Sequence, residues 1–337
     1  MGGSAILSDD CWEFGNNEAR TVVLIGRTGD GKSSTGNSIL GEKVFRSMPQ
    51  SAGVTATCEV QRTQLPNGQI LDVIDTPGLF DFSDDTKIIG NEIVKCISMA
   101  RDGIHAVLLV LSVRTRFSRE HQAAIESFQH IFGNKISDYM VVVFTGGDDL
   151  EDHNVTLDAY LGADCPEPLQ ELVAMCQNRV LLFDNRTKDP FKKAHQLKEL
   201  LEQVNLVVEK NDGKPYTNDL FKELKEGAIN FHYQKEMVDS STAHSEEGIN
   251  ELKDLMQKSH EEQISRITEM VESKLKVNIQ RLEKQLEKEH AARLVAEQKA
   301  EKAQKASKDE HRKLKDQLHS SRREIQKLRG RPVCNIM

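Results

Sequence analysis

The sequence lacks the features that mark secreted, membrane-spanning and disulfide-stabilised proteins. Its six cysteines form no C-x-x-C pair and no metal-ligand spacing, which predicts free thiols in a reducing compartment. No apolar run approaches the roughly 20 residues that span a bilayer, the N-terminus has no signal-peptide stretch, and Ile6 breaks the myristoylation pattern. The net charge of −8 argues against nucleic acid as a general partner. We therefore expect a protein of the cytosol or of the cytosolic face of a membrane.

Proline and glycine are missing from a long C-terminal stretch. No glycine lies between Gly248 and Gly330, and no proline lies between Ala243 and Pro332. Charged residues dominate there, and apolar residues recur at spacings of three and four, with only alanines between Val295 and Leu314. This stripe predicts a coiled coil over residues 246–329, although a single solvated helix fits the same pattern, and the partner and strand number stay open. The stripe consists of Ile249, Leu252, Met256, Ile264, Ile267, Val271, Leu275, Ile279, Leu282 and Leu286, then Leu314, Leu318, Ile325 and Leu328.

The chain before this tail alternates strand-like and helical patterns, and its 337 residues exceed the roughly 100–200 of a usual domain. Strands are predicted at 21–25, 57–65, 70–74, 106–111, 140–144 and 180–183, and helices at 32–40, 85–100, 118–132, 166–177 and 192–208. A hairpin signal at 66–68 makes the second and third strands antiparallel. The alternation predicts an α/β fold, a mostly parallel sheet with helices on both faces. We divide the chain into a flexible segment (1–18), a nucleotide-binding domain (19–211), a helical linker (212–245), the coiled coil (246–329) and a basic tail (330–337).

Residues 26–33 fill every fixed position of the phosphate-loop pattern G-x-x-x-x-G-K-[ST]. The glycines let successive backbone N–H groups form an anion nest, Lys32 supplies a charge for the β- and γ-phosphates, and Ser33 offers a hydroxyl to Mg²⁺. Asp30 is compatible with phosphate only if its side chain points outward. The strand before and the helix after this loop argue against a chance match. The expected nucleotide contacts are Gly26, Arg27, Thr28, Gly29, Asp30, Gly31, Lys32, Ser33 and Ser34.

A second motif, Asp75-Thr76-Pro77-Gly78, closes the strand at 70–74. An aspartate there can hold the Mg²⁺ shell, and the Gly78 N–H can meet a γ-phosphate. The polar segment 47–57 resembles a switch, in which Thr55 is our choice for a second Mg²⁺-facing hydroxyl and Thr57 the alternative. An ordinary Pro-Gly turn is the competing interpretation of the motif. Ser33, Thr55 and Asp75 are thus the predicted metal ligands.

A third motif, Thr145-Gly146-Gly147-Asp148, follows the strand at 140–144. GTPases usually carry Asn or Thr, then Lys, any residue and Asp at this place, and the aspartate accepts two hydrogen bonds from guanine. Asp148 occupies that position, but Gly146 replaces the lysine that normally lies against the base. Because the motif is weak by itself, Asp149 stays an alternative and ATP stays a competing nucleotide.

The three motifs together resemble the immune-associated nucleotide-binding GTPases, also called the GIMAP family, relatives of septins and chloroplast Toc receptors. The resemblance covers residues 20–206 and is most specific at 25–41, at 75–81 and at 103–118, which looks like the family's own signature box. The Thr-Gly-Gly-Asp form resembles the plant branch. The resemblance implies GTP or GDP with Mg²⁺, a guanine contact at Asn185, a first-switch contact at Ser47, and dimerisation through the nucleotide face.

The expected mechanism follows partly from a missing residue. Many small GTPases place a Gln after the glycine of the Asp-x-x-Gly motif to orient water, but Leu79 stands here, so an isolated monomer should hydrolyse GTP slowly. The resemblance suggests that Arg116 reaches the phosphates of a second copy, whereas a solvated arginine opening a helix is the alternative. A membrane-tethered switch, with a role in defence or stress, and a GTP-dependent scaffold with negligible hydrolysis are the two functions to separate.

The last four residues, Cys334-Asn335-Ile336-Met337, form a C-a-a-X box whose terminal Met suits a farnesyl group on Cys334. One lipid chain binds membranes marginally, and the nearby arginines and lysines would add attraction to an anionic leaflet. A chance cysteine and ordinary helix-dipole charges are the alternatives. We expect a peripheral membrane protein, with the endoplasmic reticulum as one candidate.

Overall fold

The computed structural model describes residues 19–47, 55–65, 68–79, 85–239 and 246–329. They form two compact units, one that ends at Asn278 and one that begins at Ile279. The first unit contains the sheet and extends past the predicted end of the nucleotide-binding domain at residue 211.

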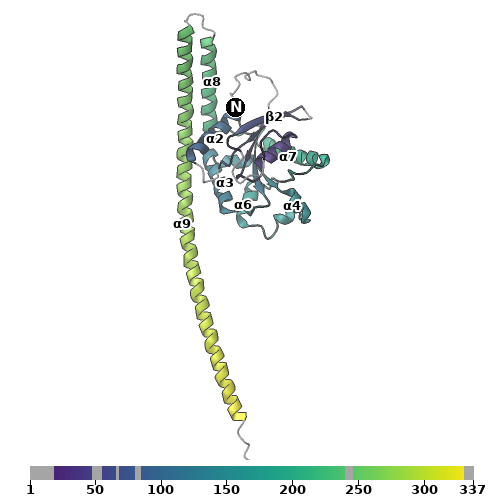
Figure 1. The fold of residues 1–337 in the computed structure, drawn as a ribbon, viewed down its shortest axis with the longest axis vertical. Helices are drawn as coiled ribbons and strands as arrows, with labels where there is room; N and C mark the ends of the chain where they lie inside the picture. Colours follow the sequence, from purple (N-terminus) through teal and green to yellow (C-terminus); the bar gives the residue numbers. More distant parts are fainter. Residues whose placement is uncertain (1–18, 48–54, 66–67, 80–84, 240–245, 330–337) are drawn as a thin grey trace, which may run out of the picture. The chain divides into compact units, whose positions relative to one another are not determined.

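A six-stranded sheet in the order β2-β3-β1-β4-β5-β6 forms the centre of the first unit (Figure 1). All neighbouring strands are parallel except β2 and β3, which pair antiparallel as the hairpin signal predicted. β4 is buried at every position, as expected for an apolar strand covered on both faces. The α/β fold predicted from the sequence is therefore confirmed. The strands are β1 (Arg20–Ile25), β2 (Glu59–Gln64), β3 (Ile70–Asp75), β4 (Ala106–Ser112), β5 (Met140–Thr145) and β6 (Val180–Phe183).

The predicted helices are present with ends shifted by at most two residues, and further short ones were not predicted. The predicted set is α1 (Lys32–Leu40), α2 (Thr86–Met99), α3 (Arg119–Phe132), α6 (Glu167–Met175) and α7 (Pro190–Lys210). The unpredicted set is η1 (Asn134–Tyr139), α4 (Gly147–Asp152) and α5 (Leu157–Tyr160). These are one or two turns long, too short to carry a helical apolar period.

The strand register places the three motifs at one edge of the sheet. Leu24 pairs with Asp75 across β1 and β3, and Thr145 pairs with Ser112 of β4 and with Phe183 of β6. The loops after β1, β3, β5 and β6 therefore leave the sheet at the same side, because parallel strands share the direction of their carboxyl ends.

Two long helices follow α7. α8 (Asp219–Asp239) and the start of α9 (Glu246–Arg329) run side by side within the first unit (Figure 1). A Cβ on Gly227 of α8 would meet the Gln263 side chain at 2.7 Å, and one on Gly90 of α2 would meet the Thr268 carbonyl oxygen at 3.5 Å. The Asn278 amide donates to Ser127 Oγ of α3 at 2.6 Å. The first part of α9 thus packs on α2, α3 and α8.

This packing corrects the interpretation of the apolar stripe. Ile267, Val271 and Leu275 are at most 3% exposed inside the first unit. Their partners are elements of the same chain, so this part of the stripe does not serve a coiled-coil partner. In the second unit α9 continues as a helix, on which the stripe residues Leu286, Leu314, Leu318 and Ile325 are exposed. A heptad pattern indicates that a helix has an apolar face, but it does not identify the surface that covers this face.

No helix in the described ranges is long and apolar enough to cross a membrane.

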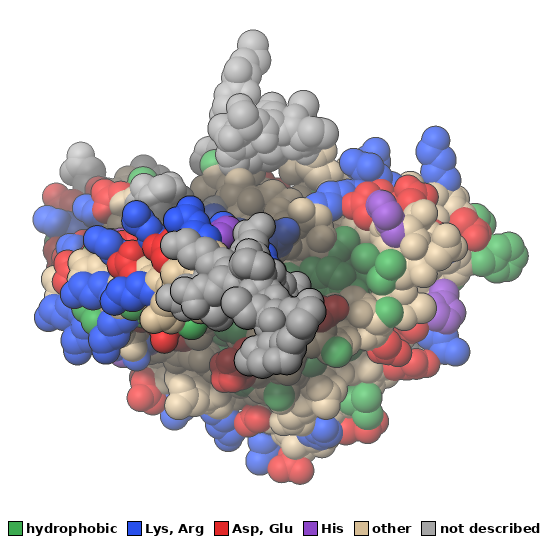
Figure 2. Space-filling view, turned by 90° about the horizontal axis from the view of Figure 1, so that it is seen from below, with side chains coloured by type: hydrophobic (Ala, Val, Ile, Leu, Met, Phe, Trp, Pro, Cys, Tyr) green, Lys and Arg blue, Asp and Glu red, His purple; other side chains and the backbone are tan. Residues whose placement is uncertain are grey.

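Figure 2 shows lysines and arginines beside aspartates and glutamates across the face in view.

Candidate nucleotide site

The loop between β1 and α1 has the backbone of a phosphate cradle. Gly26, Gly29 and Gly31 all have positive φ angles, 150°, 93° and 97°. Gly26 cannot be replaced by a larger residue, because a Cβ would lie 2.4 Å from the Val110 carbonyl oxygen of β4. Gly31 is the left-handed N-cap of α1, and its conformation turns the chain so that the positive end of the helix faces the loop.

Lys32 is held at the centre of this loop. Its Nζ donates to the carbonyl oxygens of Gly26 and Arg27, each at 2.9 Å, and the side chain is buried. Thr28 and Gly29 are exposed at the tip of the loop, and Ser34 is half-buried in the first turn of α1. The ammonium group is therefore positioned on the loop side where an anionic phosphate would sit.

Ser33, Thr55 and Asp75, the three predicted metal ligands, lie together beside Lys32. Ser33 Oγ donates to Asp75 Oδ2 at 2.5 Å and lies 3.0 Å from Thr55 Oγ1. Asp75 is 1% exposed, and among the described residues its Oδ1 has no hydrogen-bond partner. Burial raises the pKa of Asp75, although Ser33 and Lys32 act in the opposite direction. A buried carboxylate with an unpaired oxygen and two neighbouring hydroxyls fits Mg²⁺, a hard cation that takes oxygen ligands.

The alternative hydroxyl, Thr57, lies elsewhere. Its Oγ1 donates to the Glu92 carboxylate of α2 at 3.0 Å, and Lys95 donates to the same hydroxyl. Thr57 therefore belongs to a contact between α2 and the segment before β2, and of the two threonines only Thr55 contacts the Ser33–Asp75 pair.

The end of the second motif is buried against the sheet. Gly78 and Leu79 are both buried, and the Leu79 N–H donates to the Pro77 carbonyl oxygen at 2.7 Å. The Leu79 side chain is 3% exposed and packs in the core, so it offers no group that could orient a water molecule.

The third motif forms the N-terminus of α4. Gly146 is a left-handed N-cap with φ 91°, and Asp148 lies in the first turn. Arg114 Nη2 contacts Asp148 Oδ2 at 2.7 Å, and Arg186 Nη1 contacts the same oxygen at 3.4 Å. Arg114 Nε also pairs with Asp149. The predicted base-reading carboxylate is thus held between the loops that follow β4 and β6.

Asn185 lies in the loop after β6 and contacts α1. Its amide Nδ2 donates to Thr35 Oγ1 at 3.0 Å, and its Oδ1 accepts from Ser38 Oγ at 2.8 Å. Asp184 shapes this loop by accepting from the N–H groups of Arg186 and Thr187. Burial alone would raise the pKa of Asp184, but the Lys192 ammonium and these donors outweigh it and lower the pKa below its usual value. Asn185 is therefore fixed beside the phosphate-loop helix, and its contact with guanine stays a prediction.

Ser47 lies at the end of a segment that Asn37 ties to α1. Asn37 Oδ1 accepts from the N–H groups of Val44 and Phe45, and Nδ2 donates to the Phe45 carbonyl oxygen at 2.8 Å. Asn37 Nδ2 also lies 3.4 Å from Ser47 Oγ. Asn37 was not among the predicted site residues, because its role depends on where the following loop returns.

Asp30 turns toward α3 and is only 3% exposed, so it does not point into solvent. Its Oδ2 accepts from the Arg27 N–H at 3.1 Å and lies 3.6 Å from His121 Nε2. His121 Nδ1 accepts from the Ser118 N–H at 3.1 Å, which places the imidazole proton on Nε2, facing the carboxylate. His121 is a second residue that the sequence analysis missed, because nothing in the spacing of the two side chains indicates that they meet.

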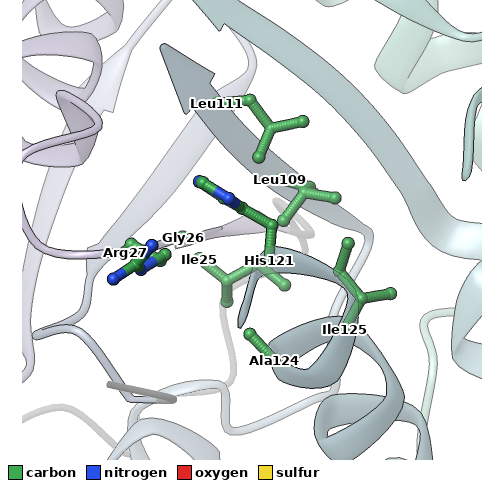
Figure 3. A pocket seen from close by; sticks show the side chains of 8 residues that line it. All are labelled: Ile25, Gly26, Arg27, Leu109, Leu111, His121, Ala124 and Ile125. Carbon is green, nitrogen blue, oxygen red and sulfur yellow. The ribbon is translucent and has the colours of Figure 1, made fainter. Parts of the chain in front are cut away.

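A small pocket lies beside this pair (Figure 3). It is bordered by the phosphate-loop residues Gly26 and Arg27 on one side and by His121 of α3 on the other. Leu109 and Leu111 of β4 form its apolar wall. The pocket therefore directly adjoins the phosphate loop.

Arg116 lies in the loop between β4 and α3 and is exposed, so it could be reached by another molecule. Cys334 lies outside the described residues, and its lipidation stays a prediction.

Three features lie at one edge of a mostly parallel sheet: a phosphate loop, an oxygen-lined cation position and a loop that leads to an aspartate. Together they define a P-loop nucleotide-binding protein. The AIG1 family model matches residues 20–236, and this chain belongs to the AIG1 family. Immune-associated nucleotide-binding protein 9 of Arabidopsis thaliana is 51% identical over 330 residues, which cover 97% of this chain and 96% of the relative. Immune-associated nucleotide-binding protein 8 of the same plant is 48% identical and covers 74% of this chain and 70% of the relative. These matches agree with the family resemblance and its plant-type branch.

Among solved structures, Toc33 from Arabidopsis thaliana in complex with GDP and Mg²⁺ is similar with a TM-score of 0.45 and 21% sequence identity. The match covers 59% of this chain and 88% of Toc33.

Proposed function

We propose that this chain binds GTP with Mg²⁺ and hydrolyses it slowly, and that turnover rises when two copies associate through their nucleotide faces. The observation that carries this proposal is the cluster of Ser33, Thr55 and Asp75 beside Lys32. Thr55 comes from the segment before β2 and Asp75 from the end of β3, so the cluster couples two switch-like segments to the phosphate loop. Mg²⁺ bound there would neutralise charge on the β- and γ-phosphates.

Slow turnover in the monomer follows from the buried Leu79. No side chain at that position can orient water, and Arg116 is exposed in a loop on the same edge of the sheet. An arginine supplied by a second molecule adds roughly 10³–10⁵ in rate in GTPases that use one. Arg116 is our choice for that group.

Guanine preference rests on Asp148, whose carboxylate can accept from both N1–H and the 2-amino group of guanine. Adenine presents an acceptor at N1, so the same carboxylate would meet a lone pair. The names of the Arabidopsis relatives support nucleotide binding and a role in defence. We propose a molecular switch in that setting, tethered to a membrane through Cys334.

Turnover measured against protein concentration tests the proposal. The full chain is required, because truncation after Lys210 would expose core residues that α8 and α9 cover. We expect phosphate release per molecule to climb with concentration for GTP and to stay near background for ATP. The Arg116→Ala variant should lose the climb, while Arg62→Ala, which breaks an exposed pair with Asp72 at the sheet edge, should keep it.

Two other outcomes would change the proposal. Tight GTP binding with flat, negligible turnover at every concentration would favour the scaffold, in which binding drives assembly and hydrolysis plays little part. A preference for ATP would show that Asp148 does not read guanine.

A further inference from the structure

Arg114 occupies the space beside the base-reading loop. It follows β4 in the turn that leads to α3, where its N–H donates to Ser112 Oγ at 3.2 Å. Its guanidinium spans two carboxylates, with Nη2 at 2.7 Å from Asp148 Oδ2 and Nε paired with Asp149. The hydrogen bond to Asp149, together with the charges of both aspartates, raises the pKa of Arg114. This arginine is therefore a permanent positive charge fixed by the loop that carries Asp148.

The same space explains why this chain has no lysine in the motif. A Cβ on Gly146 would lie 2.8 Å from Val113 Cγ2 and 3.7 Å from Arg114 Cγ. Gly146 also has φ 91°, a conformation that side chains disfavour. Residues 113 and 114 thus fill the position into which a side chain at 146 would extend, and the apolar stem of Arg114 lies next to it.

We propose that Arg114 is a specificity-determining residue for guanine, in which its stem and charge replace the missing lysine of the N/T-K-x-D motif. This inference rests on the proposed guanine-nucleotide binding. The arginine orients the Asp148 carboxylate through Oδ2, which Arg186 Nη1 also contacts at 3.4 Å, and the other oxygen, Oδ1, is left for the base. Its methylene stem flanks the base plane, as an arginine or lysine stem covers apolar surface while its head stays polar.

A purely structural role predicts a different result. If Arg114 only fastened α4 to the β4–α3 loop, its loss would lower the affinity for all nucleotides equally. If Arg114 orients Asp148, its loss weakens only the ligand whose base donates to Asp148. The ratio of GDP to ADP affinity therefore separates the two roles, because both ligands share the diphosphate and the ribose.

The test is displacement of a fluorescent GDP analogue from the full chain in Mg²⁺ by GDP, IDP and ADP. We expect Arg114→Ala to lower GDP affinity by about tenfold, the effect of about 1.4 kcal/mol, and to change ADP affinity by less than about twofold. IDP lacks the 2-amino group, so the substitution should lower the affinity for IDP less than the affinity for GDP. Arg114→Lys, which keeps stem and charge, should restore most of the GDP preference. Arg62→Ala is the matched control, since the Arg62–Asp72 pair has similar geometry at 2.7 Å, far from the site.

The outcomes separate the two proposals. A GDP-to-ADP ratio in Arg114→Ala equal to that of the unmodified chain overturns this inference and leaves guanine binding intact. An unmodified chain that binds ADP as tightly as GDP overturns the proposed function, and the inference falls with it. The Arg114 side chain is 41% exposed, so the alanine variant should fold, and Arg114→Met supplies a second variant that keeps the stem without the charge.

Discussion

Replacing Asp75 by Asn should stabilise the protein when neither Mg²⁺ nor nucleotide is bound. The same replacement should remove most of the stabilisation that Mg²⁺ and nucleotide give to the unmodified chain. Asp75 is 1% exposed, and its Oδ1 has no hydrogen-bond partner among the described residues. A buried polar group without a partner costs about 1–3 kcal/mol, and more if charged. The asparagine removes the charge, although its amide N–H needs a partner as well. We therefore expect a net gain of about 1 kcal/mol, or about 2–4 °C in Tm for a unit of this size.

With Mg²⁺ and GTP bound, the unmodified chain should be more stable than the Asp75→Asn variant. In the unmodified chain, Mg²⁺ with GTP at about 100 times Kd adds about 2.7 kcal/mol by mass action. The asparagine variant lacks the anionic ligand, so its gain should be a small part of that figure. Its Tm should then be higher than that of the unmodified chain in EDTA and lower in Mg²⁺ with GTP.

Thermal melts in EDTA, in Mg²⁺, and in Mg²⁺ with GTP measure this crossing. Asp72→Asn is the control, because Asp72 lies on the same strand but pairs with the exposed Arg62. Burial raises the pKa of Asp75, so in EDTA its penalty is present above that pKa and disappears as the pH falls below the ordinary carboxyl value. The advantage of the variant should shrink accordingly in acid. An equal ligand response in both proteins would refute the assignment of Asp75 to the cation.

Three further predictions concern the base, the pH response and the packing of α9. Asp148→Asn should lower GDP affinity by about 10² and favour XDP, because the amide can donate to the C2 carbonyl of xanthine; an unchanged GDP affinity in nucleotide displacement would argue against guanine reading. Burial lowers the pKa of His260, which stacks on Phe231 at 4.6 Å, so its contribution to stability is present above about pH 6.5 and is lost as the pH falls from there through the lowered pKa. His260→Gln should flatten this part of the pH profile in denaturant titrations, and an unchanged slope would contradict it. Leu275→Ala should lower the free energy of unfolding by about 2–5 kcal/mol, because Leu275 is buried. Leu286 is 58% exposed, so Leu286→Ala should lower it by less than about 0.5 kcal/mol. Equal losses in urea unfolding would show that Leu275 is not packed as described.

The sequence by itself determined the elements that depend on neighbouring residues. The phosphate loop is readable because glycine is required where φ is positive, as at Gly26 and Gly31. The six strands and five of the helices are readable because apolar periodicity and turn residues lie within short windows. Asp75 could be assigned a role because its motif follows a strand directly.

Only the tertiary structure decided which distant side chains meet. Arg114 reaches Asp148, Asp30 meets His121, and Asn185 contacts α1, and none of these pairs has a spacing that a local pattern records. The apolar stripe of α9 shows the same limit, since its first part is covered by the chain's own helices. Local patterns report the chemistry of a face, whereas the partner of that face is set by long-range packing, in which residues far apart in the chain compete to bury the same surface.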